Sequence, residues 1–177
     1  MSSHVVFGAG LIGSYLGASM HQLGFKVALV CRASVKSKLA QGVTLTDYQE
    51  HYAQAQELNF LDSEVLLKLK PEQIACDYLW LTVKCHGVEQ ALLDIAPLVS
   101  KRTVILCCQN GLGSEAPVKR AYPNNTVLRV MVPFNVVELE KGHLHRGSQG
   151  DLTIEQANKA DLSEKLVSSL NSDLLPV

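Results

Sequence analysis

The chain has 177 residues, of which 47% are hydrophobic, and its 16 Lys and Arg side chains nearly balance its 17 Asp and Glu side chains. This length and composition predict a well-buried globular core. The balanced charge excludes the basic surface that neutralises nucleic-acid phosphates, so we expect no nucleic-acid partner.

An apolar run, a glycine turn and a helical pattern open the chain. The run "HVVF" is followed by apolar residues at helical spacing from Leu11 to Leu23, and Gly24 is suited to end that helix. A β-rich run, "KVALVCR", comes next. This order predicts a βαβ unit with two parallel strands.

The segment from 33 to 75 is less regular. We expect a short helix at Val35 to Ala40, a strand in "GVTLTDY", a mixed stretch and a helix near Ser63 to Leu69 that Pro71 ends.

Strands and helices alternate again after residue 75. "DYLWLTVK" and "TVILCC" predict buried strands on either side of a helix in "GVEQALLDIAPLV". The turn "QNGLGS" leads to a helix from Glu115 to Arg120, and then to strands in "TVLRVMVPFNVVE", "HLHRG" and "GDLTIE". An amphipathic segment runs from Lys159 to Leu170. We predict a Rossmann-like, doubly wound, mostly parallel α/β sheet, with an antiparallel extension after Thr126, near the C-terminus.

The five cysteines form no C-x-x-C pair and no zinc-type spacing. An odd number in such a chain favours a reducing compartment over a disulfide framework. Glycines interrupt the first apolar run, and no run reaches the roughly 18 residues of a membrane-spanning helix. We therefore expect a cytoplasmic protein without a membrane partner. Cys107 and Cys108 are expected to pack in a buried strand.

Gly8, Gly10 and Gly13 form a G-x-G-x-x-G pattern between the first strand and the first helix. In this position the first glycine allows a tight turn, the second leaves room for a pyrophosphate, and the third lets the helix pack close to the strand. The free N–H groups at the helix start attract the anion. We predict a dinucleotide site; the alternative is a turn that serves only helix packing.

Arg32 ends the second strand, where NAD-binding proteins usually carry Asp or Glu. A guanidinium suits a phosphate, and Ser34 and Lys36 offer further donors. The sequence therefore favours NADP(H) over NAD(H). The alternative is a solvated arginine at a strand end.

Lys84 and Asn110 follow two other predicted strands, at the edge of the sheet where ligands bind. A lysine there can bind a substrate carboxylate or carbonyl, and an asparagine can bind a ribose or an amide. The alternatives are a solvated lysine and a turn-forming "NG". His143 and His145 share a strand face without a third ligand, so we expect no metal.

Several of these stretches together resemble the 2-dehydropantoate 2-reductase (ketopantoate reductase) family. They are "GAGLIGSYLGA", Arg32, "LTVKCHGVEQAL", "QNGLGSEAPVKRAYP" and "LHRGSQGDLTI". The resemblance covers the chain from Val5 to about Leu170. It implies the NADPH-dependent reduction of 2-dehydropantoate to (R)-pantoate, a step in pantothenate and coenzyme A biosynthesis.

The resemblance also implies a role for each matching residue. The turn formed by Gly8, Ala9, Gly10, Leu11, Ile12 and Gly13 binds the pyrophosphate, and Arg32 binds the 2′-phosphate. Lys84 and Asn110 lie on the nicotinamide and substrate side as the candidate catalytic residues. Asn135, in "FNVV", lies close to the nicotinamide.

Family members carry a C-terminal helical domain that supplies a lysine as general acid. The chain ends at Val177, so we expect residues 1–177 to be the NADP-binding domain alone. This predicts NADPH binding with little reductase activity from the isolated chain, and self-association through a face that the second domain would cover. The substrate is expected to be a small 2-oxo acid. The alternatives are a reductase of another 2-oxo or 3-hydroxy acid and a non-catalytic NADPH-binding module.

Overall fold

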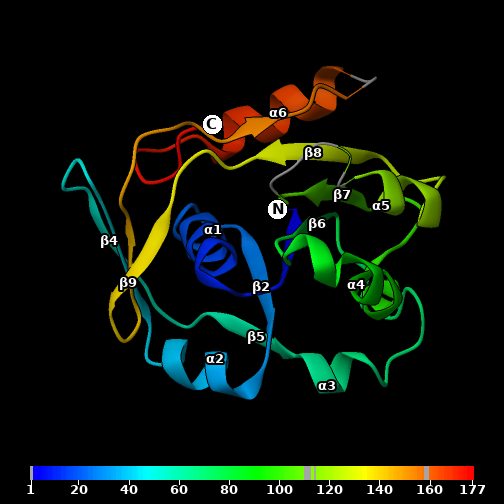
Figure 1. The fold of residues 1–177 in the computed structure, drawn as a ribbon, viewed down its shortest axis with the longest axis horizontal. Helices are drawn as coiled ribbons and strands as arrows, with labels where there is room; N and C mark the ends of the chain where they lie inside the picture. Colours follow the sequence, from blue (N-terminus) through cyan, green and yellow to red (C-terminus); the bar gives the residue numbers. More distant parts are fainter. Residues whose placement is uncertain (1, 110–112, 114, 158–159) are drawn as a thin grey trace.

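The computed structural model describes residues 2–109, 113, 115–157 and 160–177. Within these residues the chain forms two sheets, and helices cover both faces of the larger one (Figure 1).

The larger sheet positions the candidate site. In the described part of the chain it has seven strands, in the order β11-β8-β7-β6-β1-β2-β5. Neighbouring strands are parallel except for β11, which runs antiparallel to β8. The strands are β1 (Ser3–Phe7), β2 (Lys26–Cys31), β5 (Asn59–Asp62), β6 (Tyr78–Leu81), β7 (Val104–Cys107), β8 (Val127–Met131) and β11 (Thr153–Ile154). The chain runs outward from β1 to β2 and β5 and returns on the other side of β1 at β6. The strand order therefore reverses between β1 and β6, as expected for a doubly wound sheet.

Alternate residues of the strands pack into two hydrophobic cores, one on each face of the sheet. Val6 and Trp80 pack on the face covered by α1, whereas Val5 and Leu79 pack on the opposite face. Successive strand residues point to opposite faces, so apolar runs such as "YLWL" are those of strands covered on both sides. The helices are α1 (Leu11–Gln22), α2 (Ala33–Leu39), α3 (Ser63–Leu66), α4 (Val88–Asp94), α5 (Ala116–Ala121) and α6 (Ala160–Leu170), with short 3₁₀ helices η1 (Cys85–Gly87) and η2 (Ala96–Leu98).

A second, smaller sheet packs against α1 (Figure 1). Its four strands within the described residues have the order β4-β3-β10-β9, and β10 runs parallel to β3. The strands are β3 (Val43–Asp47), β4 (Tyr52–Ala55), β9 (Val136–Glu140) and β10 (His143–Arg146).

The antiparallel extension predicted after Thr126 is confirmed, and it is short. β8 joins the large sheet parallel to β7, and only the short β11 extends that sheet in the antiparallel direction. β9 and β10 pair with each other in the second sheet instead. Pro133 follows β8 and has no N–H group to continue a ladder, so the chain leaves the large sheet there.

His143 and His145 both contact the hydroxyl of Thr46, on the neighbouring strand. Nε2 of His143 lies 2.8 Å and Nδ1 of His145 lies 2.9 Å from Thr46 Oγ1. A hydroxyl can both donate and accept, so one threonine can serve both rings. The described residues contain no group of three or more metal-ligating side chains.

Cys107 and Cys108 are buried, as predicted. Burial raises the pKa of the Cys107 thiol to about 12, so it packs as a small apolar group. None of the helices in the described part of the chain has the length and apolar character needed to cross a lipid bilayer.

Candidate functional site

The turn after β1 leads directly into α1. Gly8 has a φ of +107°, a conformation that side chains rarely adopt, and its carbonyl accepts a hydrogen bond of 2.7 Å from Gly10 N. Ala9 N donates to Val30 O at 3.2 Å and so joins the turn to β2. Gly10 is the N-cap of α1, and no side chain among the described residues caps the helix. The first N–H groups of α1 therefore point toward the space beyond the sheet edge.

The three glycines occupy three different environments. A Cβ at Gly8 would lie 2.9 Å from Val83 N, and a Cβ at Gly13 would lie 2.6 Å from Thr82 Oγ1 and still closer to Gly8 O. A Cβ at Gly10 would meet nothing within 4 Å. Gly8 and Gly13 are thus required by packing, whereas Gly10 leaves open space in front of the helix. This is the division expected for a pyrophosphate-binding turn.

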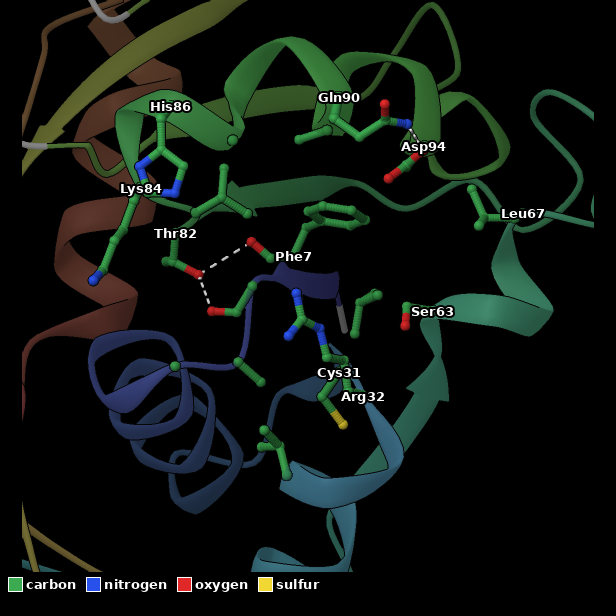
Figure 2. Close-up of a pocket in the computed structure, with 18 residues that line it drawn as sticks. Phe7, Cys31, Arg32, Ser63, Leu67, Thr82, Lys84, His86, Gln90 and Asp94 are labelled. Atoms are coloured by element: carbon green, nitrogen blue, oxygen red, sulfur yellow. Dashed lines mark hydrogen bonds between the residues drawn. The ribbon is translucent and has the colours of Figure 1, made fainter.

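A crevice crosses the carboxyl edge of the sheet at the point where the strand order reverses (Figure 2). One half has a volume of about 560 Å³ and the other about 680 Å³. Both halves are lined by Gly10, Thr82, Val83 and Lys84, so these four residues stand where the halves meet.

Arg32 lies in the first half of the crevice. It follows β2 directly, is the N-cap of α2 and is exposed. Among the described residues it forms no ion pair. Val35 is the α2 residue that lines the crevice beside it, whereas Ser34 and Lys36 lie elsewhere on that helix. An exposed guanidinium at this edge is available to bind an anion.

The opposite wall of the first half comes from α3 and α4, which the sequence reasoning did not assign to the site. Its residues are Ser63, Leu67, Gln90 and Asp94. The Gln90 amide donates to Asp94 Oδ1 at 2.8 Å, across one turn of α4. These residues lie on or next to two short helices that are far apart in the sequence. No local sequence pattern therefore identifies them as part of one site.

Lys84 follows β6 after Thr82 and Val83, as predicted, and its side chain is exposed where the two halves of the crevice meet. In the second half it is joined by Leu11 and Ile12 of the first turn of α1, and by Asn135. Asn135 lies between β8 and β9, and its N–H group donates to Ser148 Oγ at 3.0 Å. Asn110 lies outside the described residues.

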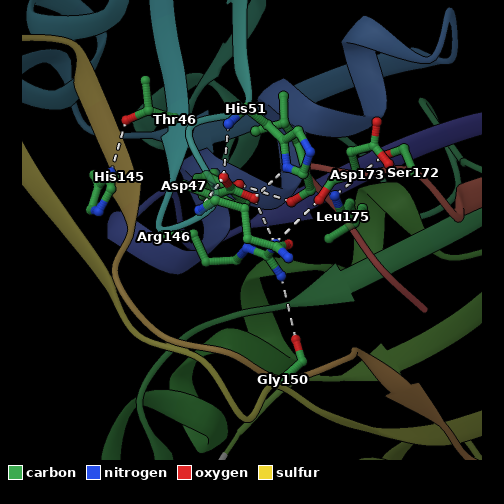
Figure 3. A network of polar contacts seen from close by, with 12 residues as sticks. Thr46, Asp47, His51, His145, Arg146, Gly150, Ser172, Asp173 and Leu175 are labelled. Atoms are coloured by element: carbon green, nitrogen blue, oxygen red, sulfur yellow. Dashed lines mark hydrogen bonds and ion pairs between the residues drawn. The ribbon is translucent and has the colours of Figure 1, made fainter.

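A separate polar cluster ties the second sheet to the C-terminal segment (Figure 3). Arg146 is 1% exposed, and its Nη2 lies 2.8 Å from Asp47 Oδ2 and 3.2 Å from the carbonyl oxygen of Asp173. His51 Nδ1 lies 3.0 Å from the same carboxylate oxygen of Asp47. Burial alone raises the pKa of the Asp47 carboxyl, but hydrogen bonds from Arg146 and His51 outweigh it and lower the pKa to about 2. The cluster is built around the buried Asp47–Arg146 ion pair, and it lies outside the crevice.

Comparison with known proteins places this fold in a family. The model of the family described as ketopantoate reductase PanE/ApbA matches residues 4–159. The chain belongs to this family. The match includes the glycine turn, Arg32, Lys84 and Asn135.

One curated sequence is similar to this chain, and two solved structures share its fold. A 2-dehydropantoate 2-reductase of Lactococcus lactis is 29% identical over 124 residues, which are 69% of this chain and 38% of the relative. A solved 2-dehydropantoate 2-reductase of Geobacter metallireducens superimposes with a TM-score of 0.78 at 21% identity, covering 94% of this chain and 54% of that one. A D-mandelate dehydrogenase solved with NADH and anilino(oxo)acetate gives a TM-score of 0.76 at 22% identity, covering 98% and 56%. The chain spans about half, or less, of the length of these relatives.

Proposed function

We propose that residues 1–177 form the NADP(H)-binding domain of a 2-dehydropantoate 2-reductase. The observation that carries the proposal is the crevice at the strand reversal, which has the open Gly10 turn, Arg32 and Lys84 along one continuous wall. In open α/β sheets this is the place where dinucleotides bind. Membership of the ketopantoate reductase family also supports a dinucleotide site in this crevice.

The residues present fit such a cofactor. The turn from Gly8 to Gly13 would hold the pyrophosphate, because Gly10 leaves space in front of uncapped helix N–H groups. Arg32 would hold the 2′-phosphate that distinguishes NADP(H) from NAD(H). Ala9, Leu11 and Ile12 contribute backbone to the same turn.

The second half of the crevice is where we place the substrate, a small 2-oxo acid. A nicotinamide bound in this crevice would supply the hydride for reduction of the keto carbon of the substrate. The Lys84 ammonium is suited to bind the substrate carboxylate or to donate a hydrogen bond to the keto oxygen. Asn135 borders the same space, and Asn110 is proposed as its partner from the sequence alone. We assign the general acid to none of these residues, since the family resemblance implies a lysine in a C-terminal helical domain.

Replacing Arg32 by aspartate tests the cofactor assignment. We expect the affinity for NADPH to fall by about a hundredfold, because charge-assisted hydrogen bonds are each worth about 1.5–3 kcal/mol and a carboxylate repels the phosphate. The affinity for NADH should change by less than about threefold, since NADH lacks that phosphate. Isothermal titration calorimetry with both nucleotides measures the two affinities.

Arg102→Asp is the matched control, because it makes the same charge change at a position remote from the crevice. Arg102 lies just before β7, at the amino edge of the sheet, whereas the crevice lies at the carboxyl edge. It should leave both affinities unchanged. An unaltered NADPH to NADH ratio in the Arg32 variant would make Arg32 a solvated strand-end residue and remove the basis for preferring NADP(H).

A further inference from the structure

We propose that Thr82 is a positioning residue that holds the Gly8–Gly13 turn and Lys84 in a fixed relation, so that a dinucleotide bound on the turn lies beside Lys84. The inference rests on the proposed function and concerns a residue that touches the turn.

The Thr82 side chain bonds to the end of β1 and to the glycine turn (Figure 2). Its hydroxyl lies 2.7 Å from Gly8 O and 3.1 Å from Phe7 O, and the two carbonyl oxygens share its single donor hydrogen. Thr82 N also donates to Phe7 O at 3.0 Å. One residue after β6 thus binds the last residue of β1 and the first residue of the turn.

Thr82 and Val83 lie directly against Gly8 and Gly13, with no room for a side chain at either glycine. The positions where Gly8 and Gly13 would carry a Cβ lie 2.9 Å from Val83 N and 2.6 Å from Thr82 Oγ1. The backbone of Thr82 and Val83 therefore packs directly on the turn at Gly8, and the Thr82 side chain packs on Gly13 in the first turn of α1. A displacement of one side has to displace the other.

Lys84 is two residues beyond Thr82, and both residues line both halves of the crevice. The N–H groups at the start of α1 belong to one segment and the Lys84 ammonium to another. The Thr82 hydroxyl is a direct polar link between those segments. Its role is therefore to set the orientation of the Gly8–Ala9 peptide relative to the strand that carries Lys84.

Thr82→Val is the informative change, because valine has nearly the same shape but places a methyl group where the hydroxyl lies 2.7 Å from Gly8 O. Carbon and oxygen approach no closer than about 3.3 Å, so the Gly8 carbonyl has to move and the turn moves with it. We expect the dissociation constants for NADPH and NADH to rise by the same factor, about tenfold, since the pyrophosphate is common to both.

Thr82→Ser keeps the donor and should bind both nucleotides within about twofold of the wild type. Thr82→Ala removes the hydroxyl without adding a methyl group, and it should weaken both by about fivefold even if the valine variant does not fold. Equal losses for the two nucleotides distinguish this role from that of Arg32, whose loss changes their ratio.

Thr103→Val is the control for a purely structural effect. The Thr103 hydroxyl is buried and donates to Cys76 O at 2.6 Å, just before β7 and remote from the crevice. This variant should lose thermal stability and keep wild-type affinities in the same calorimetric titrations.

Wild-type affinity in folded Thr82→Val or Thr82→Ala, or an equal loss of affinity in Thr103→Val, would overturn the inference while leaving the proposed function intact. A wild-type chain that binds neither nucleotide would overturn both.

Discussion

Replacing Gly10 by valine is expected to reduce the affinity for NADPH by about a thousandfold, or about 4 kcal/mol, while the protein still folds. A Cβ at Gly10 meets no protein atom within 4 Å, and the backbone is in an extended conformation that valine adopts readily. The new methyl groups would fill the space in front of the first N–H groups of α1, where the pyrophosphate is proposed to lie. Valine is a poorer N-cap than glycine, so a stability loss of about 1 kcal/mol is expected.

Calorimetric titration with NADPH and a thermal melt of the same preparation measure the two effects. Gly13→Ala provides the contrast, because its Cβ would collide with Gly8 O and Thr82 Oγ1. That variant should lose stability and affinity together. Undiminished NADPH binding by Gly10→Val would mean that the glycines serve only the packing of α1 on the sheet.

Replacing Arg146 by methionine is expected to cost about 3–5 kcal/mol of unfolding free energy at neutral pH. The change leaves the Asp47 carboxylate, whose side chain is 0% exposed, without the guanidinium 2.8 Å away. It also removes the hydrogen bond to the carbonyl of Asp173, through which the second sheet binds the C-terminal segment. Urea unfolding followed by circular dichroism measures the loss.

The loss should depend on pH in a defined direction. In the wild type, the pKa of Asp47 is lowered to about 2 from an ordinary 3.8, so its ionised form adds stability that is complete above about 3.8 and disappears as the pH falls toward 2. In the variant, burial without the guanidinium raises the pKa of Asp47, and protonation relieves the buried charge. The stability deficit should therefore be smaller at pH 4 than at pH 7.

The double variant Asp47→Asn, Arg146→Met supplies the control. Asparagine keeps an acceptor for the N–H groups of Gln49 and His51, which Asp47 Oδ1 now accepts, but carries no charge. It should regain most of the stability lost by Arg146→Met alone. Equal destabilisation of the single and double variants would show that the charge of Asp47 does not account for the effect.

Local patterns predicted the large sheet because each βαβ unit is contiguous in the sequence. The apolar runs of β1, β2, β6 and β7 and the helices between them lie close to their predicted places. The second sheet was not predicted, because β3 pairs with β10 about a hundred residues later, for example Thr44 with His143. Alternating apolar and polar residues predict a strand, but they do not indicate which sheet it joins or which strand it pairs with.

The sequence predicted those site residues that belong to a local motif or follow a predicted strand. Gly8, Gly10, Gly13, Arg32 and Lys84 line the crevice or its turn, as their positions after strands suggested. Thr82 was not predicted, because threonine is common in β-strands and its presence in an apolar run indicates nothing more. Its hydrogen bonds to Phe7 and Gly8 form only because β6 lies beside β1. The Asp47 and Arg146 pair was missed for the same reason, since its members meet only through β3 and β10.

A calorimetric titration of the wild-type chain with NADPH and, separately, with NADH tests whether this crevice binds NADP(H). We expect one NADPH bound per chain and a clearly weaker affinity for NADH, because Arg32 is proposed to bind the 2′-phosphate. Absence of binding by either nucleotide, or a preference for NADH, would contradict the assignment of this crevice to NADP(H).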